Sequence, residues 1–143
     1  MLTVRHLLEQ KDRAVRAVAP DDPVLEAIRA MAEHHVGALL VMQNNELLGI
    51  VSERDYARKV ILLGRSSADT AVREIMTSPV VTVSPLSTLD ECMRLVAERR
   101  VRYLPVVENG RTVGVVSIGD LVKATIEEQQ RTIEQLESYI HHS

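Results

Sequence analysis

The 143-residue chain contains no phenylalanine, no tryptophan and only three tyrosines. Its hydrophobic core must therefore be built from aliphatic side chains, and with 45% hydrophobic residues a packed core is expected. Proteins that bind single-stranded nucleic acids usually stack the bases on aromatic side chains. A net charge of −3 also argues against a surface that follows a phosphate backbone. We therefore expect no nucleic-acid partner.

Cysteine is nearly absent too. The single cysteine, Cys92, can form no internal disulfide and no metal site by itself, and its place in a segment of helical apolar spacing predicts a small buried side chain. The longest apolar run, GALLVM at residues 37–42, is far below the roughly 20 residues that span a bilayer. The N-terminal residues show no cleavable signal pattern. We expect a cytoplasmic protein without a membrane partner.

Sequence patterns of catalytic sites are missing as well. The chain has no HExxH, GxSxG, CxxC or phosphate-loop motif, so we expect neither catalysis nor a catalytic cofactor. His34 and His35 are adjacent, and on a helix two neighbouring side chains point about 100° apart, which does not suit one metal ion. A position at a helix end or on the surface is expected for both, and no metal site is predicted.

What the chain does contain is an internal repeat. When the sequence is shifted by 65 residues, at least twelve positions between 18 and 60 fall on an identical residue without a gap. The pairs include Val18 with Val83, Pro20 with Pro85, Gly49 with Gly114, Ser52 with Ser117 and Asp55 with Asp120. Upstream, VRHLL at 4–8 resembles VREIM at 72–76 at an offset of 68. We predict one repeat at 4–65, with its core at 15–63, and a second at 70–125.

Each half predicts the same elements in the same order. A β-rich segment at 15–20 or 80–85 ends at a proline, and Asp21 or Ser87 is expected to cap the helix that follows. Apolar spacing places those helices at 23–34 and 88–99. Hairpins follow, with strands at 38–42 and 47–52 and at 103–107 and 112–117; their turns are Asn44-Asn45 and Asn109-Gly110. A second helix is expected at 54–63 and from 120 onward.

The predicted fold class is therefore α/β (α+β), made of two β-α-β-β-α repeats. One such unit buries too little apolar surface to be stable alone. We expect the two sheets to pack face to face around one shared core, with the helices outside. A pseudo-twofold axis would then relate the repeats, and their equivalent loops would meet near it.

The C-terminal residues predict a further helix at 126–140. Ile126, Ile133, Leu136 and Ile140 form an apolar stripe that is too short for an independent coiled coil. We expect this helix, and an opening helix at about 3–10, to pack on a sister subunit or on the module, and we expect a homodimer. Residues 141–143, which include two histidines, are expected to form a tail.

The repeated Ser-x-x-Asp at 52–55 and 117–120 has two interpretations. In the structural one, Ser52 and Ser117 cap a helix by accepting backbone N–H groups, and the aspartates complement the positive end of the helix dipole. In the functional one, the hydroxyl binds a phosphate while Asp55 or Asp120 accepts hydrogen bonds from the two hydroxyls of a ribose. Aliphatic strands would then enclose an adenine ring, which backbone groups would recognise.

At this point the residues carry a resemblance. The order of elements, the strands GALLVM and YLPVV, and G-h-h-S-x-x-D (h, hydrophobic) at 49–55 and 114–120 resemble a pair of CBS domains, the Bateman module. The resemblance covers about residues 4–125 and is closest to small stand-alone CBS-pair proteins. It implies a regulatory module that binds adenosine-containing molecules such as AMP, ADP, ATP, NAD or S-adenosylmethionine between the repeats. It also implies dimers that form a disc of four repeats.

The resemblance further implies which residues bind the ligand. Ser52 and Ser117 would contact phosphate or ribose, and Asp55 and Asp120 would bind ribose. The adenine would be held by backbone near the first and middle strands, at Val18, Ala38, Val83, Tyr103 and Pro105.

The two halves differ at the motif itself. Arg54 in the first repeat falls on Gly119 in the second, which predicts a phosphate-binding guanidinium in the first half only. Arg102 falls on Gly37 and would give the second half its own phosphate ligand. If both arginines face the central cleft, the site would suit a dinucleotide or two mononucleotides.

Two functional hypotheses remain open beside each other. In the first, the chain is a non-catalytic sensor of adenosine-containing ligands that acts in trans on an unknown effector protein. In the second, it is a ligand-independent structural or interaction dimer whose Ser-x-x-Asp motifs only cap helices. An enzyme acting on a nucleotide phosphate is the weakest alternative, because no paired carboxylates have metal-like spacing.

Overall fold

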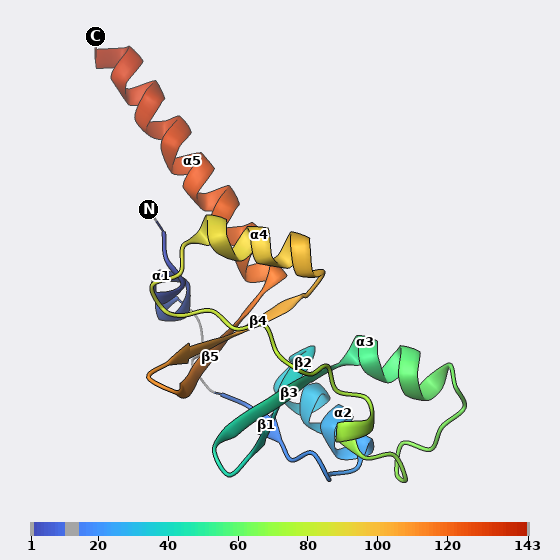
Figure 1. The fold of residues 1–143 in the computed structure, drawn as a ribbon. Coiled ribbons are helices and arrows are strands. Elements are labelled where there is room, and N and C mark those ends of the chain that lie inside the picture. The colour runs from blue at the N-terminus through green and yellow to red at the C-terminus, as the bar shows by residue number, and fades with distance from the viewer. Residues whose placement is uncertain (1, 11–14, 143) are drawn as a thin grey trace.

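The computed structural model describes residues 2–10 and 15–142 (Figure 1). Residues 11–14 of the first predicted repeat and Ser143 of the predicted tail lie outside the described residues. The elements in chain order are α1 (Val4–Glu9), β1 (Ala17–Val18), α2 (Val24–His34), β2 (Ala38–Gln43), β3 (Glu46–Ser52), α3 (Glu53–Tyr56), the π-helical turn η1 (Ala57–Ile61), the 3₁₀ turn η2 (Val72–Glu74), α4 (Leu89–Arg99), β4 (Tyr103–Glu108), β5 (Arg111–Ser117) and α5 (Ile118–His142).

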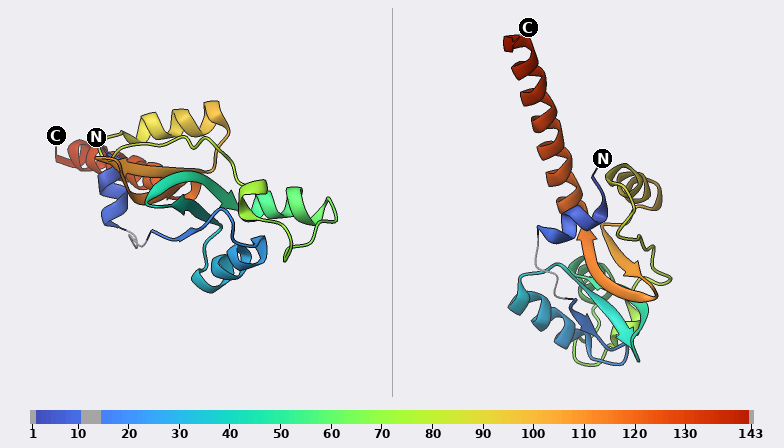
Figure 2. Two further views of the ribbon diagram at one scale, coloured as in Figure 1. Left: turned by 60° about the horizontal axis from the view of Figure 1, so that its bottom comes forward. Right: turned by 90° about the vertical axis from the view of Figure 1, so that its left-hand side faces the viewer.

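Two small sheets lie between the helices. In the first repeat β2 pairs with β3 in antiparallel and with β1 in parallel, and in the second repeat β4 and β5 form the matching antiparallel pair. Figure 2 shows the sheets stacked between α4 on one side and α2 on the other. The predicted α/β architecture of two repeats, with sheets facing each other and helices outside, is confirmed.

The strand predicted at 80–85 is not formed, and Pro105 explains why. In the first repeat the Leu40 N–H donates to the Arg16 carbonyl at 3.1 Å, next to the β1–β2 pairing. Pro105 occupies the position of Leu40 and has no N–H to donate. The described segment 80–85 therefore meets β4 only at an isolated bridge between Val83 and Val106. The second sheet has two strands where the first has three.

The hairpin turns form where the sequence predicts them. Asn44 and Asn45 have φ angles of 53° and 65°, and Asn109 and Gly110 have φ angles of 52° and 77°. Two successive positive φ angles are typical of a type I′ turn, whose twist matches that of the flanking strands. The register of both hairpins shifts at the same step, so the repeats share one geometry.

The predicted helix caps at Asp21 and Ser87 are wrong. Helix α2 begins after Pro23, and α4 begins after Thr88, whose hydroxyl accepts the Glu91 N–H at 3.1 Å. Asp21 instead forms an ion pair with the turn η2, and the Ser87 hydroxyl closes the turn before the helix. Neither helix begins at the predicted residue, because Asp21 pairs with Arg73 of η2 and Ser87 bonds within the turn before α4.

The buried side chains form two clusters, so the single shared core that the sequence suggested is not observed. Successive strand residues point to opposite faces of a sheet. Leu39 and Val41 therefore join the cluster under α2, whereas Leu40 points toward the other sheet and lines a cleft. The outer face of each sheet makes its own core, and the inner faces border the clefts described below.

The leading segment of each repeat completes the core of the other. Val72 and Ile75, at the start of the second repeat, are fully buried in the cluster of the first repeat. Val4, Leu7 and Leu8 of α1 are buried in the cluster of the second. Figure 1 shows α1 beside the second repeat, close to β5 and α4. The two repeats are therefore interlocked rather than merely joined by a linker.

We call these two leading segments, which pack in the core of the opposite repeat, the exchanged segments. Backbone hydrogen bonds hold both of them in the same way. The Val24 N–H at the start of α2 donates to the Thr70 carbonyl at 2.8 Å. The Leu89 N–H at the start of α4 donates to the Leu2 carbonyl at 3.0 Å. The first N–H groups of a helix have no acceptor within the helix, and here each exchanged segment supplies one.

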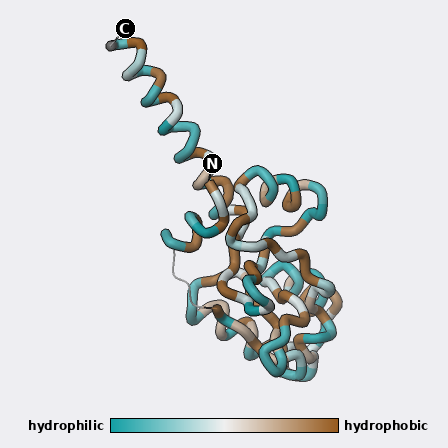
Figure 3. The backbone as a smooth tube through the Cα atoms, turned by 60° about the vertical axis from the view of Figure 1, so that its left-hand side comes forward, coloured by the Kyte–Doolittle hydropathy of each residue, from teal (hydrophilic) through white to brown (hydrophobic). Residues whose placement is uncertain are grey.

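Helix α5 is continuous from Ile118 to His142, so the helices predicted from 120 onward and at 126–140 are one element. His141 and His142 belong to it and not to a tail. The helix projects from the body (Figure 1), and hydrophobic and hydrophilic residues alternate along it (Figure 3). Its large exposed apolar residues, between 43% and 73% accessible, are Val122, Ile126, Ile133, Leu136, Tyr139 and Ile140. The stripe therefore does not pack on the module itself.

A substitution at Gly49 tests the close contact between β3 and the exchanged segment of the second repeat. A Cβ atom there would lie 2.8 Å from both the Met76 sulfur and the Thr77 carbonyl oxygen, and that backbone atom is held by its own strand bridge. At the equivalent Gly114 the added atom would meet only the flexible Leu8 side chain, at 2.7 Å. We expect Gly49→Ala to lower the free energy of unfolding by about 1–3 kcal/mol and Gly114→Ala to lower it less, as measured by urea denaturation.

Gly119→Ala is the matched control, because its added Cβ atom would lie 3.6 Å from its nearest neighbour. Alanine is favoured over glycine in a helix by roughly 0.5–1 kcal/mol, so this variant should be neutral or more stable. Equal losses at all three glycines would contradict the close approach at Gly49.

Cys92 yields a prediction about chemical reactivity. The thiol is fully buried in the second cluster, and burial, with a smaller contribution from Glu91, raises its pKa from 9.0 to about 11. Since the thiolate is the reactive form, only about one thiol in a thousand is ionised at pH 8. We expect no reaction with a disulfide reagent at pH 8 in the native protein and rapid reaction after unfolding. Labelling of the native protein at the unfolded rate would contradict a closed core.

Candidate ligand clefts between the repeats

Two cavities lie between the repeats, and the 65-residue shift relates them. Cleft A, of about 420 Å³, is lined by residues 34–40 of the first repeat together with Tyr103, Val115 and Ser117 of the second. Cleft B, of about 310 Å³, is lined by residues 99–103 of the second repeat together with Ile50, Ser52 and the start of α3 from the first. Each cleft therefore combines the Ser-containing strand end of one repeat with the helix-to-strand turn of the other.

The Ser-x-x-Asp motif forms a capping box in both repeats. The Ser52 hydroxyl accepts the Asp55 N–H at 3.1 Å, while Asp55 Oδ2 accepts the Ser52 N–H and the Ser52 hydroxyl, both at 3.0 Å. In the second repeat Ser117 and Asp120 exchange the same two backbone bonds, at 2.9 and 3.1 Å. The predicted structural role of the motif is confirmed in both copies.

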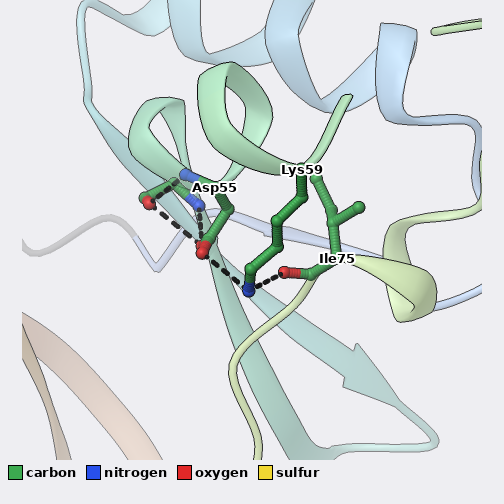
Figure 4. Close-up of polar contacts among 4 residues, drawn as sticks. Asp55, Lys59 and Ile75 are labelled. Atoms are coloured by element: carbon green, nitrogen blue, oxygen red, sulfur yellow. Dashed lines mark hydrogen bonds and ion pairs between the residues drawn. The ribbon is translucent and has the colours of Figure 1, made fainter. Parts of the chain in front are cut away.

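Lys59 belongs to cleft B but was missed in the sequence. Its ammonium group lies 3.1 Å from Asp55 Oδ1 and donates to the Ile75 carbonyl at 2.9 Å (Figure 4). Lys59 thereby links the capping box to the exchanged segment of the second repeat. Its spacing of four residues from Asp55 was the available signal. The equivalent residue of the second repeat is Ala124, so cleft A lacks this lysine.

Arg54 and Arg102 line the same cleft. The sequence analysis assigned them to different repeats and left open whether both face one cleft. In the structure both border cleft B. The reason is that each cleft takes its motif from one repeat and its turn from the other. Arg102, ahead of burial and Arg58, lowers the pKa of the Arg54 guanidinium. Arginine side chains in proteins carry a positive charge. Because Arg54, Arg58 and Arg102 line the same cavity, positive charge accumulates in cleft B.

The two repeats also differ in the size of two adjacent side chains that line the clefts. The Tyr103 hydroxyl lies where a Cβ atom of Gly37 would be, at 2.5 Å, so only glycine fits beside the ring. Under the 65-residue shift Arg102 is equivalent to Gly37 and Ala38 is equivalent to Tyr103, so the large and small residues are interchanged between the repeats. Tyr103 lines both clefts. Burial, and then Glu53, raise the pKa of its hydroxyl, so it is neutral at physiological pH.

The other predicted site residues fall into two groups. Ala38 and Ser117 line cleft A, whereas Ser52 and Asp55 line cleft B. The remaining five do not line either cleft: Val18, Val83, Pro105, Gly119 and Asp120. Val18 and Val83 pack with the two buried clusters, so only their backbone groups are available for a ligand. Their roles in binding stay predictions.

His35 and Arg100 occupy equivalent positions with a left-handed backbone. They follow the last residues of α2 and α4 with φ angles of 55° and 54°, and each lines one cleft. Glycine is the usual residue at this point, because side chains with a Cβ atom are strained there. The predicted helix-end role of His34 and His35 is confirmed, and both border cleft A.

Comparison with known proteins identifies the family. The CBS domain model matches residues 2–61 and 72–127. The chain belongs to the CBS-domain family. It is 42% identical over 125 residues to the mitochondrial CBS domain-containing protein CBSX3 of Arabidopsis thaliana. This match covers 84% of the chain and 61% of the relative. It is 35% identical over 107 residues to the CBS domain-containing protein YhcV of Bacillus subtilis, covering 75% and 76% respectively.

A solved structure agrees with this assignment. It is that of a protein of Burkholderia ambifaria described as a signal-transduction protein with CBS domains. The two chains are 49% identical, with a TM-score of 0.85, and the match covers 89% of this chain and 96% of the other. The chain is therefore a tandem CBS-domain protein. The chain matches 61% of the length of the Arabidopsis relative, which is less than two thirds of that protein.

No group of three or more His, Cys, Asp or Glu side chains that could hold a metal ion occurs among the described residues. Within residues 2–10 and 15–142, no helix is both long and apolar enough to cross a membrane.

The left-handed positions give a stability prediction. Replacing His35 or Arg100 by glycine removes the Cβ strain, so we expect each variant to raise the free energy of unfolding by about 1 kcal/mol. Urea denaturation measures the change. His34→Gly, one residue earlier and inside α2, is the control and should lower stability by about 1 kcal/mol. Destabilisation of both left-handed variants would contradict the observed backbone.

Proposed function

We propose that this CBS pair is a non-catalytic sensor of adenosine-containing ligands, which bind in the clefts between the repeats and change the action of a partner protein. The observation that carries the proposal is that each cleft joins a Ser-containing capping box from one repeat to a turn from the other. A ligand seated there contacts both repeats and stabilises one relative arrangement. Ligands that bind one arrangement better than another shift the population toward it.

The polar groups around cleft B suit a ribose phosphate. Asp55 has about four acceptor directions on its two oxygens, and three are used by Ser52 and Lys59. One remains for a ribose hydroxyl, and a second becomes available if Lys59 moves to a phosphate. The aliphatic residues Ile50, Val80 and Val81 line the same cavity and supply flat walls for an adenine ring.

Backbone recognition of adenine is supported at Val81. In cleft A the equivalent carbonyl, that of Arg16, accepts the Leu40 N–H. Pro105 has no N–H to offer the Val81 carbonyl, and Val81 lines cleft B. We propose that this carbonyl accepts a hydrogen bond from the exocyclic amine of adenine, which a guanine cannot provide at that position.

The output is proposed to be in trans and through a homodimer. The projecting part of α5 carries five large apolar residues that are about half to three quarters exposed. A second copy is the proposed cover for this surface, and an effector protein would read the arrangement of the pair. The alternative, a ligand-independent interaction dimer, is supported by the complete capping boxes, since the motif already has a structural role without any ligand.

Thermal melting with AMP, ADP, ATP, NAD, NADH, S-adenosylmethionine and GTP distinguishes the two. A ligand at 100 times its dissociation constant stabilises the folded state by about 2.7 kcal/mol, which is a shift of several degrees for a chain of this size. We expect at least one adenosine compound to produce such a shift and GTP to produce a smaller one. Asp55→Ala or Asp120→Ala should remove it.

Both aspartate variants also lose a helix cap, so a control for stability is needed. Thr88→Ala removes the corresponding cap of α4. Thr88 itself lines neither cleft, and its loss should cost a similar amount of about 1 kcal/mol. The melting temperature of Thr88→Ala should fall while its ligand-induced shift is retained. Absence of saturable binding by every compound would leave the interaction dimer as the better account.

A further inference from the structure

Cleft B collects an unusual amount of unpaired positive charge. Five arginines line it: Arg54, Arg58, Arg99, Arg100 and Arg102. Within the part of the chain that the structure describes, none of these guanidinium groups forms a salt bridge. Among the described residues that line the cavity, Asp55 has the only carboxylate, and it is paired with the sixth cation, Lys59. The five arginines therefore leave the cavity with a local charge of about +5.

The fold does not require this charge, because the pseudo-symmetric cleft lacks it. Shifting the sequence by 65 residues pairs Arg99 and Arg100 with His34 and His35. The same shift replaces Arg102 and Arg54 with glycines and Arg58 with a lysine. Cleft A has the same capping box and the same turn, but among the described residues that line it Arg16 is the single arginine. A structural role common to both repeats therefore cannot account for the five arginines.

The arginines are also close enough to repel one another. The neighbouring charges of Arg102 and Arg58 act on Arg54 inside a cavity of about 310 Å³. Like charges gathered around a small cavity destabilise the empty protein and favour the entry of an anion. Guanidinium groups bind phosphate oxygens with two parallel hydrogen bonds, and several of them can engage successive phosphates of one chain.

The geometry points to cleft B as a binding site for a linear chain of three or more phosphates, one per protein chain, with cleft A unable to bind the same group. Such a chain carries enough negative charge to balance most of the five arginines, whereas a single phosphate leaves the majority unpaired. The tail of a nucleoside triphosphate and inorganic polyphosphate share this chemistry. The inference rests on the proposed use of cleft B as a ligand site but not on the recognition of adenosine.

Calorimetric titration of the full chain with inorganic tripolyphosphate tests this site. We expect binding of one tripolyphosphate per chain, with affinity at least about 30-fold above that of orthophosphate, because more charge-assisted hydrogen bonds form. Raising the salt concentration should weaken it, since the arginines are solvent-accessible. Arg54→Gln/Arg102→Gln should reduce the affinity at least about tenfold. Its melting temperature without ligand should not fall, because the substitution relieves repulsion.

Two control variants locate the effect. Arg111→Gln removes an exposed arginine at the start of β5, outside both clefts, and should change the affinity less than about twofold. His34→Gln/His35→Gln alters cleft A at the positions equivalent to Arg99 and Arg100 and should also leave tripolyphosphate binding unchanged. Equal weakening by either control, full affinity in the double arginine variant, or equal affinity for orthophosphate would overturn the inference.

ATP and AMP separate this inference from the proposed function. Tighter binding of ATP than of tripolyphosphate would identify a nucleotide as the source of the phosphates, and the reverse order would identify polyphosphate. Both results support the phosphate-chain site. Tripolyphosphate binding without saturable binding of any adenosine compound would retain this site and remove the proposed function. Stabilisation by AMP without tripolyphosphate binding would retain the proposed function and remove this site.

Discussion

The arrangement of the molecule depends on the exchange of leading segments between the repeats. The carbonyls of Leu2 and Thr70 accept the first helical N–H groups of the repeat to which they do not belong in sequence. Because these groups would otherwise be unsatisfied at buried helix ends, each repeat needs the other to complete its fold. This interlocking fixes the relative position of the two sheets, and the two clefts exist only because that position is fixed.

The same interlocking explains why two nearly equal clefts differ in charge. Each cleft is assembled from both repeats. Apart from Ile50 and Tyr103, which line both clefts, a lining residue belongs to one cleft, so a substitution in one repeat can change one cleft and leave the other unchanged. Arg54 and Arg102 lie 48 positions apart and in different repeats, yet both face cleft B. The position of Arg102 adds to the difference, because its equivalent in cleft A is Gly37, which has no side chain.

Local features of this fold could be predicted from the sequence, whereas contacts between the repeats could not. Asn109-Gly110 and Asn44-Asn45 specify their turns by backbone preference alone, and the Ser-x-x-Asp boxes are contained within four residues. The loss of a strand at Pro105 was predictable in principle, because a missing N–H removes a ladder bond wherever that residue pairs. The cleft to which Arg102 belongs depends on tertiary packing, for which no spacing in the sequence gives a rule.

Lys59 connects the capping box of the first repeat to the exchanged segment that interlocks the repeats. Lys59 bridges the Asp55 carboxylate in cleft B and the Ile75 carbonyl of the exchanged segment (Figure 4). A phosphate bound among the arginines, as proposed, would compete with Asp55 for the ammonium group. If Lys59 moved away from Asp55 to that phosphate, its hydrogen bond to the Ile75 carbonyl would be lost as well. Ile75 is fully buried in the first core, so this bond lies at the contact that holds the repeats together. The second repeat has alanine in place of Lys59, and cleft A therefore lacks this connection.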